Sequence, residues 1–456
     1  VYREKIGDIK MIKSQFSLFK TRRFFPLFVV QFLGAFNDNV FKNALVIMVT
    51  YKLAAQLNFN PELMVSLAAG LFILPFFLFS GTAGKIADKF EKSRLIKCIK
   101  LAEVVLMIGA CIGFVLQSIP ILMATLFGLG AQSSFFGPIK YGILPEHLAE
   151  DELISGNALI SSGTFLSILL GTLIGGLLIL APHGILIISA ITLGCSVLGL
   201  ISSYLIPKTE NQDDLLKLSL NFFKETLMIL KEAKKSRAIF LSIIGISWFW
   251  FVGATLLAQF PIYTKSVIGG DETIVTLLLA IFSIGIGLGS LLCNRLLKGI
   301  VQATYVPLGS FCITLFTLDL FWISHGVVPA EPLIGIEQFF ANPIHWRILA
   351  DLMLIAIAGG IYIVPLFAIL QKNANQKHKS RTIAANNVVN ALFMVASAIM
   401  CMVLFGQGYS ILDILIVIVV LNTLVGIYIC KLLPEAFSKT ILQKLLTLCC
   451  RIGKYK

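Results

Sequence analysis

The chain has 456 residues, of which 57% are hydrophobic and only 13% are charged, whereas charged residues make up roughly a quarter of an average soluble domain. A soluble core cannot bury that much apolar sequence, but lipid can surround it, because a helix that faces hydrocarbon is apolar all round. The net charge of +13 would suggest nucleic acid as the partner of a soluble protein. Here Lys and Arg gather between the apolar segments, so a membrane protein with no nucleic-acid partner is predicted.

Twelve apolar segments are each long enough to cross a bilayer, which takes about 20 residues of helix. The fold class is therefore predicted to be an all-α polytopic membrane protein. A long polar stretch at 207–238 leaves six segments on each side, so two six-helix bundles are expected at 24–206 and 239–432. Residues 1–23 are expected to form an N-terminal arm and 433–456 a basic tail. The spans are predicted near 24–53, 62–83, 94–117, 120–143, 153–181, 183–206, 239–264, 273–294, 302–325, 347–371, 383–406 and 409–432.

The positive charges are distributed unevenly between the two sides of the membrane. If the N-terminus is cytoplasmic, 33 of the 37 Lys and Arg residues fall on the cytoplasmic side, with Lys100 counted in the loop between helices 2 and 3. The outer side keeps Lys52, Lys265 and Arg347, and Lys42 lies within helix 1. Because loops rich in Lys and Arg stay inside, both termini are predicted to be cytoplasmic. The first 23 residues lack the apolar core of a cleavable signal peptide, so the first apolar segment is expected to remain as helix 1.

Helix 1 contains FLGAFNDNVFKNAL, which places five polar side chains at membrane depth. A charge there costs roughly 2.5–3.5 kcal/mol on insertion scales unless it is paired or hydrated. Asp38 and Lys42 are four residues apart, so they share a helix face and can pair. A cluster this large exceeds what packing requires, so we predict a polar wall of a substrate cavity; a clamp between helices is the alternative. Its members are Asn37, Asp38, Asn39, Lys42 and Asn43.

The segment between helices 2 and 3 reads GTAGKIADKFEKSR and contains Gly84, Asp88, Lys89 and Lys92. These residues match the loop motif of the major facilitator superfamily, Gly-x-x-x-Asp-Arg/Lys-x-Gly-Arg/Lys, with Glu91 in place of the second glycine. Gly84 would permit close helix contact, and Asp88 would cap a neighbouring helix or pair with a cation in one conformation. The motif therefore predicts a gate and not a group that binds substrate.

Two further cytoplasmic segments are predicted to join this gate. The loop between helices 8 and 9, GSLLCNRLLKG, is a degenerate copy of the motif that retains Arg295. Helix 4 leads into GPIKYGILPEHL, where Pro138 and Pro145 predict a structured turn that carries Tyr141 and Glu146.

Other acids are expected within the apolar segments. Glu103 in helix 3, placed about one turn inside the cytoplasmic face, could snorkel to the interface, pair with a basic residue or carry a proton. Asp319 in helix 9 is a similar case nearer the outer side. Asp351 and Arg347 are four residues apart at the start of helix 10, so a local ion pair is expected.

Two short helices are predicted outside the spans. The central loop is expected to carry an amphipathic helix over 215–235, with Leu227 and Leu230 on its apolar face. This helix is expected to lie on anionic headgroups; docking of a partner is the alternative. The outer loop between helices 9 and 10 contains IGIEQFFANPIHW, which predicts a short interfacial helix with Trp346 as an anchor.

Helices 7 and 11 supply the remaining cavity candidates. Helix 7 reads SWFWFVGATLLAQFPIY, and Trp250 and Gln259 are candidates for lining the path of an amphiphile, although side chains that merely face lipid would give the same pattern. Helix 11 opens with Asn386, Asn387 and Asn390, a second polar cluster.

Patterns typical of enzymes are absent from the sequence. The five His residues are scattered without metal-ligand spacing, and there is no glycine-rich phosphate-binding motif with Lys. The acyltransferase pattern of His followed four residues later by Asp is also absent. The nine cysteines fall mostly in apolar segments, as small buried side chains do. We therefore expect neither catalysis, nor a cofactor, nor a metal ion.

Five segments together resemble the bacterial lysophospholipid transporter family of the major facilitator superfamily. They are the helix 1 cluster, the segment between helices 2 and 3, KYGILPEHL, SWFWFVGATLLAQFPIY and IVPLFAILQ, and they spread over both halves of the chain. In particular, the chain is similar to the transporter domain that is often fused to a lysophospholipid acyltransferase.

This resemblance implies movement of lysophospholipids, mainly lysophosphatidylethanolamine, from the outer to the inner leaflet of the bacterial inner membrane, by alternating access and followed by reacylation. Membrane lipids and a lysophospholipid acyltransferase are the expected partners, and a monomer is expected. The family's acid in helix 1 matches Asp38, whereas its arginine in helix 7 is replaced by Leu257. We hypothesise that Lys42 supplies the missing positive charge.

Two other functions stay open. The first is a proton-coupled major facilitator exporter of a small amphiphilic solute, such as a drug or a siderophore, with Glu103 and Asp38 as coupling acids. The second is a scaffold for a lipid enzyme that transports nothing. Uptake that collapses when a protonophore is added would favour the exporter.

Overall fold

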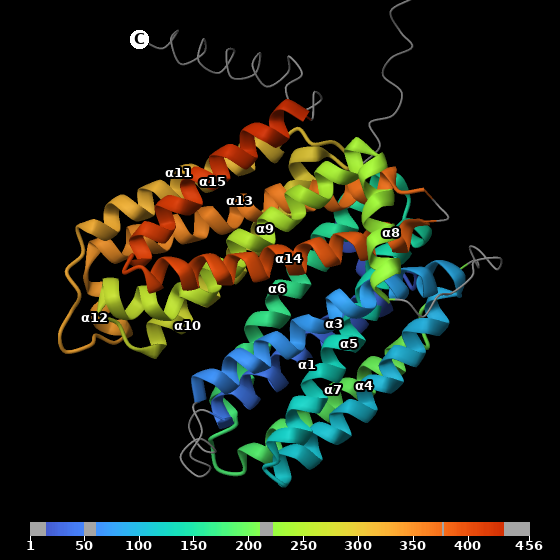
Figure 1. Ribbon diagram of the computed structural model, residues 1–456, viewed down its shortest axis with the longest axis horizontal. Helices are drawn as coiled ribbons and strands as arrows, with labels where there is room; N and C mark the ends of the chain where they lie inside the picture. The colour runs from blue at the N-terminus through green and yellow to red at the C-terminus, as the bar shows by residue number, and fades with distance from the viewer. Residues whose placement is uncertain (1–14, 50–60, 210–221, 376–377, 433–456) are drawn as a thin grey trace, which may run out of the picture.

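The structure is a computed structural model that describes residues 15–49, 61–209, 222–375 and 378–432. Within these residues it consists of helices and loops, with one isolated bridge and no assigned strand. The long helices form two six-helix bundles that lie side by side (Figure 1). The predicted all-α fold with two bundles is therefore confirmed.

Each predicted span corresponds to one long helix. The first bundle contains α1 (Phe25–Met48), α3 (Pro61–Lys89), α4 (Lys92–Val115), α5 (Ile119–His147), α6 (Leu153–Leu178) and α7 (Gly184–Ser203). The second contains α9 (Arg237–Tyr263), α10 (Glu272–Leu297), α11 (Val306–His325), α13 (Pro343–Asn373), α14 (Lys379–Gly406) and α15 (Ile411–Leu432). The shorter helices are α8 (Phe222–Lys235), α12 (Ile336–Ala341), η1 (Gln15–Lys20), η3 (Glu150–Glu152) and η4 (Thr264–Ile268).

Among the described residues, 11 helices are long and apolar enough to cross a membrane. The remaining long helix is α1, whose 24 residues give it sufficient length. Its central run of Asn, Asp and Lys lowers its mean hydropathy, so composition alone does not pick it out. It packs against α6 and α7 inside the first bundle, and we therefore count it as the twelfth span.

Two helices extend further than the sequence predicted. The motif segment from Gly84 to Lys89 is helical, because α3 continues to Lys89 and only Phe90 and Glu91 separate it from α4. The prediction of a structured turn around Pro138 and Pro145 is wrong, because α5 continues through both prolines to His147. Membrane helices tolerate internal proline when neighbouring helices and side chains satisfy the freed carbonyls.

The two ends of the molecule differ. The bundles approach each other at the end that carries α8, and their helices diverge toward the end that carries α12 (Figure 1). We call these the closed end and the far end. The closed end holds Asp88, Tyr141, Gln371 and Arg381, and it is the end predicted to face the cytoplasm.

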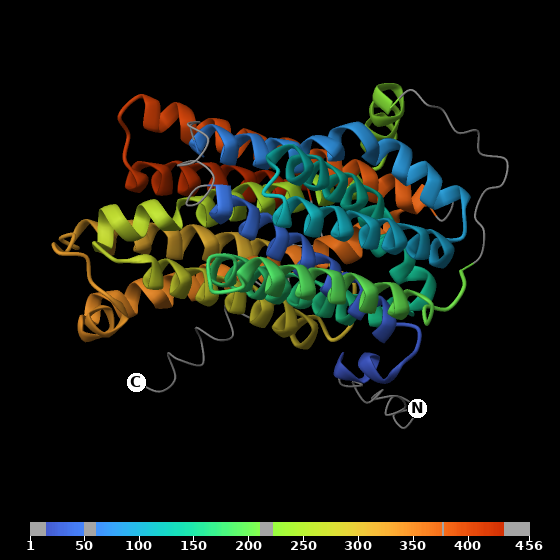
Figure 2. The same ribbon diagram turned by 90° about the horizontal axis from the view of Figure 1, so that it is seen from below.

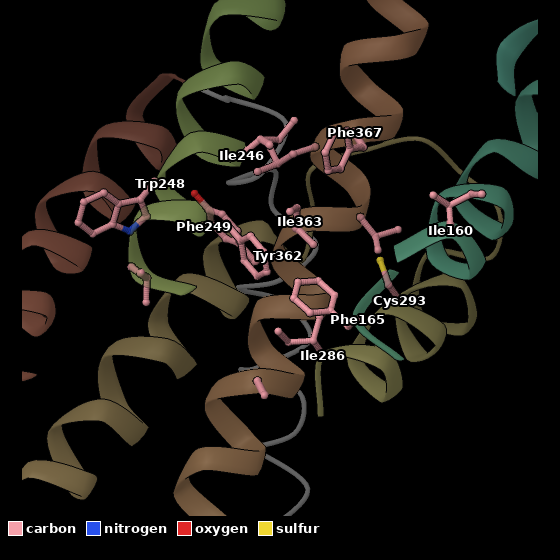
Figure 3. Close-up of a cluster of buried hydrophobic side chains, with 14 of the residues drawn as sticks. Ile160, Phe165, Ile246, Trp248, Phe249, Ile286, Cys293, Tyr362, Ile363 and Phe367 are labelled. Atoms are coloured by element: carbon pink, nitrogen blue, oxygen red, sulfur yellow. The ribbon is translucent and has the colours of Figure 1, made fainter. Parts of the chain in front are cut away.

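The apolar core continues from one bundle into the other. Ile160 and Phe165 of α6 lie opposite Ile286 and Cys293 of α10, and side chains of α9 and α13 complete the cluster (Figure 3). The ring of Phe165 stacks on Trp250 of α9, with centroids 6.1 Å apart. Apolar contact therefore seals the seam between the bundles from the closed end to the level of Phe165.

Helix α8 crosses the closed end at a steep angle to the spans (Figures 1 and 2). It packs on α3 of the first bundle and on α14 and α9 of the second. Glu225 is buried and pairs with Lys85 of α3, whereas Leu227, which the sequence placed on the apolar face, is 60% exposed. The helix therefore docks on protein through Glu225, Ile229 and Ala233, and residues 215–221 of the predicted helix lie outside the described part.

The outer loop between α11 and α13 contains α12, so the predicted short helix there is confirmed. Trp346 is exposed, and its indole nitrogen donates a hydrogen bond to the carbonyl of Phe340 at 3.0 Å. An exposed aromatic side chain with a satisfied polar atom suits the interface between lipid and water.

Candidate functional site

The middle of α1 carries the polar side chains that the sequence singled out. Asn37 lies twelve residues after the first residue of α1 and eleven before the last, so it sits at the centre of the span. Polar groups at that depth need partners inside the protein, because lipid offers none. The partners come from three other helices of the first bundle: α4, α5 and α6.

A buried ion pair occupies the centre of this region. Lys100 and Glu103 of α4 are 0% and 1% exposed, and the Lys100 ammonium lies 2.5 Å from Glu103 Oε2. Gln132 Nε2 donates to the same oxygen at 3.0 Å, and Asn37 Nδ2 lies 3.4 Å from Oε1. Of the three roles considered for Glu103, pairing with a basic residue is therefore the one observed.

Two positions in that ion pair correct the sequence analysis. Glu103 was placed about one turn inside the membrane, but it lies eleven residues after the start of α4 and thus about three turns in. Lys100 was counted as a loop cation, although it is fully buried within α4. The spacing of three residues between a Lys and a Glu in an apolar helix was the signal that could have revealed the pair.

Asp38 and Lys42 do not form the ion pair that their spacing predicted. Ser133 of α5 donates its hydroxyl hydrogen to Asp38 Oδ2 at 2.7 Å, and the other carboxylate oxygen has no hydrogen-bond partner among the described residues. The Lys42 ammonium instead lies 5.6 Å from the ring centroid of Phe72 on α3. Asp38 and Lys42 are each partly exposed as residues, although the unpartnered Oδ1 atom of Asp38 is itself buried.

Asn39 and Asn43 bind mainly to protein. Asn39 Nδ2 donates to the carbonyl of Ala35 and Asn43 Nδ2 donates to the carbonyl of Asn39, each at 2.8 Å. Asn43 also donates to the hydroxyl of Thr172 on α6 at 3.2 Å. Asn43 therefore acts as an interhelical clamp between α1 and α6, whereas the hydrogen bond of Asn39 stays within α1.

The three asparagines of α14 point to different neighbours. Asn390 Oδ1 accepts a hydrogen bond from Ser247 of α9 at 2.7 Å. Asn387 faces the first bundle, because a Cβ atom on Gly137 of α5 would come within 2.5 Å of its amide nitrogen. Asn386 is fully buried, and neither of its side-chain polar atoms has a partner among the described residues. They therefore do not form one cluster.

The aromatic and amide candidates of α9 are also separated. Trp250 lies at the seam, where it stacks on Phe165 of α6. Gln259 is nine residues further along α9, toward the far end, and lies beside Cys401 of α14. Trp250 thus takes part in the contact between the bundles, whereas Gln259 lies within the second bundle.

The motif residues form a contact between the two bundles at the closed end. Asp88 accepts hydrogen bonds from the backbone N–H groups of Ser380 and Arg381, at 2.8 and 3.2 Å, and from Arg381 Nε at 2.9 Å. Asp88 therefore caps the first turn of α14 and pairs with a cation, two roles that the sequence gave as alternatives. Gly84 allows the approach, because a Cβ there would lie 2.7 Å from Ala384 Cβ.

A second contact between the bundles was not predicted. Asn157 of α6 donates to Gln371 Oε1 of α13 at 2.6 Å, and Gln371 Nε2 donates to the carbonyl of Tyr141 at 3.1 Å. The Tyr141 ring stacks on Phe367, with centroids 4.4 Å apart. Nothing in the local sequence marks Asn157 as a partner of Gln371, because the two residues are 214 positions apart.

Salt bridges surround these contacts. Lys92 and Glu146 pair within the first bundle at 2.6 Å, and Lys372 of α13 pairs with Glu150 at 2.5 Å. Lys89 lies partly exposed beside the Phe90 ring at the end of α3. Arg295 is exposed at the end of α10 and forms no salt bridge among the described residues.

Glu91, the departure from the motif, has a local role. Its side chain caps α4 by accepting from the N–H groups of Ser93 and Arg94, at 2.9 and 2.8 Å. It also accepts from the N–H of Thr209, beyond the end of α7, at 2.9 Å. Burial would raise the pKa of Glu91, but these hydrogen bonds outweigh it and hold the pKa at about 2.

Acids near the far end also depart from the prediction. Arg347 does not pair with Asp351 one turn along α13; its Nε and Nη2 atoms donate to the two carboxylate oxygens of Asp319 on α11, at 3.1 and 2.5 Å. This is the bidentate geometry of an Arg–carboxylate pair, in which two guanidinium N–H groups donate to two carboxylate oxygens. Asp351, one turn along the same helix, does not form such a pair with Arg347.

Taken together, the first bundle provides a carboxylate and an ammonium that are held apart at mid-membrane depth, beside a buried neutral ion pair. The closed end is held by hydrogen bonds and salt bridges between the bundles. The first bundle thus carries charges of both signs that are not paired with each other.

Comparisons with known proteins agree with this architecture. Residues 27–398 match the family model described as Major Facilitator Superfamily. The chain is 30% identical over 364 residues to the lysophospholipid transporter LplT of Photorhabdus laumondii, a match that covers 78% of this chain and 81% of that protein. It is 29% identical to the protein of the same name from Escherichia fergusonii, over 79% of this chain and 82% of that one.

Solved structures of low sequence identity share the fold. A bacterial homologue of the iron transporter ferroportin in an outward-facing state has a TM-score of 0.63 at 13% identity, and the match covers 89% of this chain and 99% of that one. The transporter FucP in its outward conformation has a TM-score of 0.67 at 13% identity, with coverage of 89% and 97%.

Proposed function

The chain belongs to the lysophospholipid transporter family of the major facilitator superfamily, and we propose that it transports lysophosphatidylethanolamine from the outer to the inner leaflet of the bacterial inner membrane. The observation that carries this proposal is the separation of Asp38 from Lys42. An acid and a base one turn apart on α1 would normally pair, but here each is held by a different helix.

In the proposed complex, the ammonium of the headgroup approaches the carboxylate of Asp38, whose Oδ1 has no hydrogen-bond partner among the described residues. The phosphate approaches the ammonium of Lys42, which replaces the charge absent at Leu257. Charge-assisted hydrogen bonds of this kind are worth roughly 1.5–3 kcal/mol each. The single acyl chain stays in lipid or against the apolar side chains that line the seam.

We further propose that the bundles rock about the headgroup site by alternating access. The division into 24–206 and 239–432, joined by 207–238, makes each bundle one moving unit. The closed end would face the cytoplasm, as the distribution of Lys and Arg predicts. Opening it requires Asp88 to release α14 and Gln371 to release Asn157.

The proposed product would be delivered to a lysophospholipid acyltransferase on the cytoplasmic side, with the transporter acting as a monomer. Glu103 is assigned to charge compensation and not to proton coupling, because its carboxylate is already bound by Lys100 and Gln132. This assignment argues against the exporter mechanism in which Glu103 carries the proton.

The test is a flipping assay with labelled lysophosphatidylethanolamine in proteoliposomes. The wild type should transport the lipid, and Asp38→Asn should reduce the rate about tenfold or more, because one charge-assisted contact is lost. Asp413→Asn is the matched control, since Asp413 is an exposed acid that, among the residues the structure describes, hydrogen-bonds to Ser410 near the start of α15. A wild type that moves no lysophospholipid would refute the proposal.

A further inference from the structure

Two acids of the second bundle lie outside the proposed site. Asp319 lies thirteen residues along α11, and Asp351 lies eight residues along α13, so both are within helices that cross the membrane near the far end. Ionisable residues at such positions are costly, so each one needs a partner or a function.

Within the described part of the chain, Asp319 has a cationic partner, whereas Asp351 has none of its own. Asp319 receives both prongs of the Arg347 guanidinium. Asp351 is only 3% exposed, and its Oδ2 atom is buried without a hydrogen-bond partner among the described residues. Arg347 and Asp351 are four residues apart on one face of α13, so Asp319, which binds Arg347, lies beside Asp351, and the acid without a cation of its own faces a second acid.

The surroundings offer no second cation. Among the described residues, the charged or titratable groups that act on Asp351 are Asp319 of α11, Arg347 of its own helix and Tyr263 of α9. The Tyr263 hydroxyl is engaged with the Ser324 hydroxyl at 2.6 Å. Two ionised carboxylates and one guanidinium would therefore leave a net negative charge on the group, and the buried Oδ2 atom of Asp351 would have no partner.

One proton removes both problems. It cancels the extra negative charge, and it gives Asp351 an O–H group that can donate to an oxygen of Asp319. Two carboxylates in contact do not both ionise readily, and a shared proton is the usual solution. The side chains of Asp319 and Arg347 are 32% and 56% exposed, so the proton can reach the pair from water by way of Asp319.

We propose that Asp319 and Asp351 form a proton-binding site, in which one proton is held on Asp351 and shared with Asp319. Binding forms an O–H bond on Asp351 with a proton delivered by water, and release returns that proton to water without any other reactant. Release leaves like charges between α11 and α13, so occupancy of the site controls how these two helices pack. The site does not depend on which solute the protein transports.

Infrared difference spectroscopy of the full chain in nanodiscs, with isotope-labelled aspartate, tests the site directly. The wild type should show a protonated aspartic acid at neutral pH whose signal disappears as the pH is raised. Asp351→Asn should remove that signal, whereas Asp413→Asn, which alters an exposed acid, should leave it unchanged. Retention of the signal in Asp351→Asn, or its absence from the wild type, would overturn the proposal.

A second variant decides the matter even if Asp351→Asn does not fold. Asp319→Asn frees Arg347 to pair with Asp351, which should ionise Asp351 and abolish the signal at neutral pH. A signal that survives in Asp319→Asn would show that the two acids do not share a proton. Neither measurement uses lysophospholipid, so failure of the lipid assay and failure of this site can be told apart.

Discussion

The two bundles have the same number of spans but keep their charges in different places. The first bundle holds the Lys100–Glu103 ion pair, Asp38 and Lys42 at mid-membrane depth. The second has neutral groups at the corresponding depth: the Trp248 indole donates to Asn422 at 2.7 Å, and its acids lie nearer the far end. One bundle therefore carries charges of both signs at mid-span, whereas the groups of the other bundle at that depth are neutral.

The neutral region of the second bundle is centred on Asn422, whose side chain is hydrogen-bonded at both ends. Asn422 accepts from Trp248 and donates to the carbonyl of Ser310 and the hydroxyl of Thr314, both at 2.8 Å. The cavity beside Trp248 measures about 20 Å³, room for roughly one water molecule. A cavity of this size does not hold a lipid headgroup, which is consistent with the proposed headgroup site in the first bundle.

The largest loss of folding stability is expected from breaking the buried ion pair between Lys100 and Glu103 in the first bundle. Lys100→Met leaves Glu103 ionised and unpaired inside the protein, which should destabilise the fold by ~3–5 kcal/mol. The loss should appear as a clearly lower melting temperature of the purified protein in detergent. The double variant Lys100→Met/Glu103→Leu should recover most of it, because no unpaired charge remains. If the double variant is as unstable as the single one, then Lys100 and Glu103 stabilise the fold by more than compensating each other's charge.

A smaller change in stability is expected from breaking the contact of Asp88 with α14 at the closed end. Asp88 belongs to the motif copy of the first bundle, and the degenerate copy in the second bundle has no acid at the matching position. Asp88→Asn removes the charge that holds Ser380 and Arg381, a loss of roughly 1.5–3 kcal/mol. A cysteine placed at Ala384, which is buried at this contact, should then react with a thiol reagent about tenfold faster or more.

The matched control for the motif contact is Arg295→Gln. It alters the degenerate copy of the motif in the second bundle, where Arg295 is exposed. It should leave labelling at position 384 unchanged. Equal acceleration by both substitutions would mean that the two copies are equivalent, contrary to the comparison.

Lys42→Ala is expected to change the stability of the fold least, while slowing transport. Loss of one charge-assisted contact should slow lysophosphatidylethanolamine flipping about tenfold without lowering the melting temperature. Lys265→Ala is the control, because it removes the same charge from an exposed position on η4 at the far end. Undiminished flipping by Lys42→Ala would rule out Lys42 as the replacement for the charge absent at Leu257.

Sequence patterns predicted the helices well because length and hydropathy are properties of each segment alone. They predicted pairings poorly because partners are chosen in three dimensions. Spacing placed Asp38 and Lys42 on one face of α1, but Ser133 of α5 and Phe72 of α3 proved to be their neighbours. The same spacing argument failed for Arg347, which found a better fork geometry on another helix.

Asp88 was predicted correctly because its motif specifies a contact between helices and not merely a spacing. The proline rule failed in α5 because it assumes a chain in water, whereas helices on all sides support this one. Asn157 and Gln371 could not have been paired from local patterns, since only the assembled bundles bring them together.

Within the described residues, polar contacts tie the chain between the bundles to the first bundle at two points, and α8 also packs on α14 and α9 of the second. Thr209, just beyond α7, is bound by Glu91, and further along the chain Glu225 of α8 is bound by Lys85. Helix α8 ends at Lys235 and α9 begins at Arg237, so only Ser236 separates them. Because one residue joins α8 to α9, we expect a proline or a glycine insertion at this joint to change the orientation of α8 relative to α9.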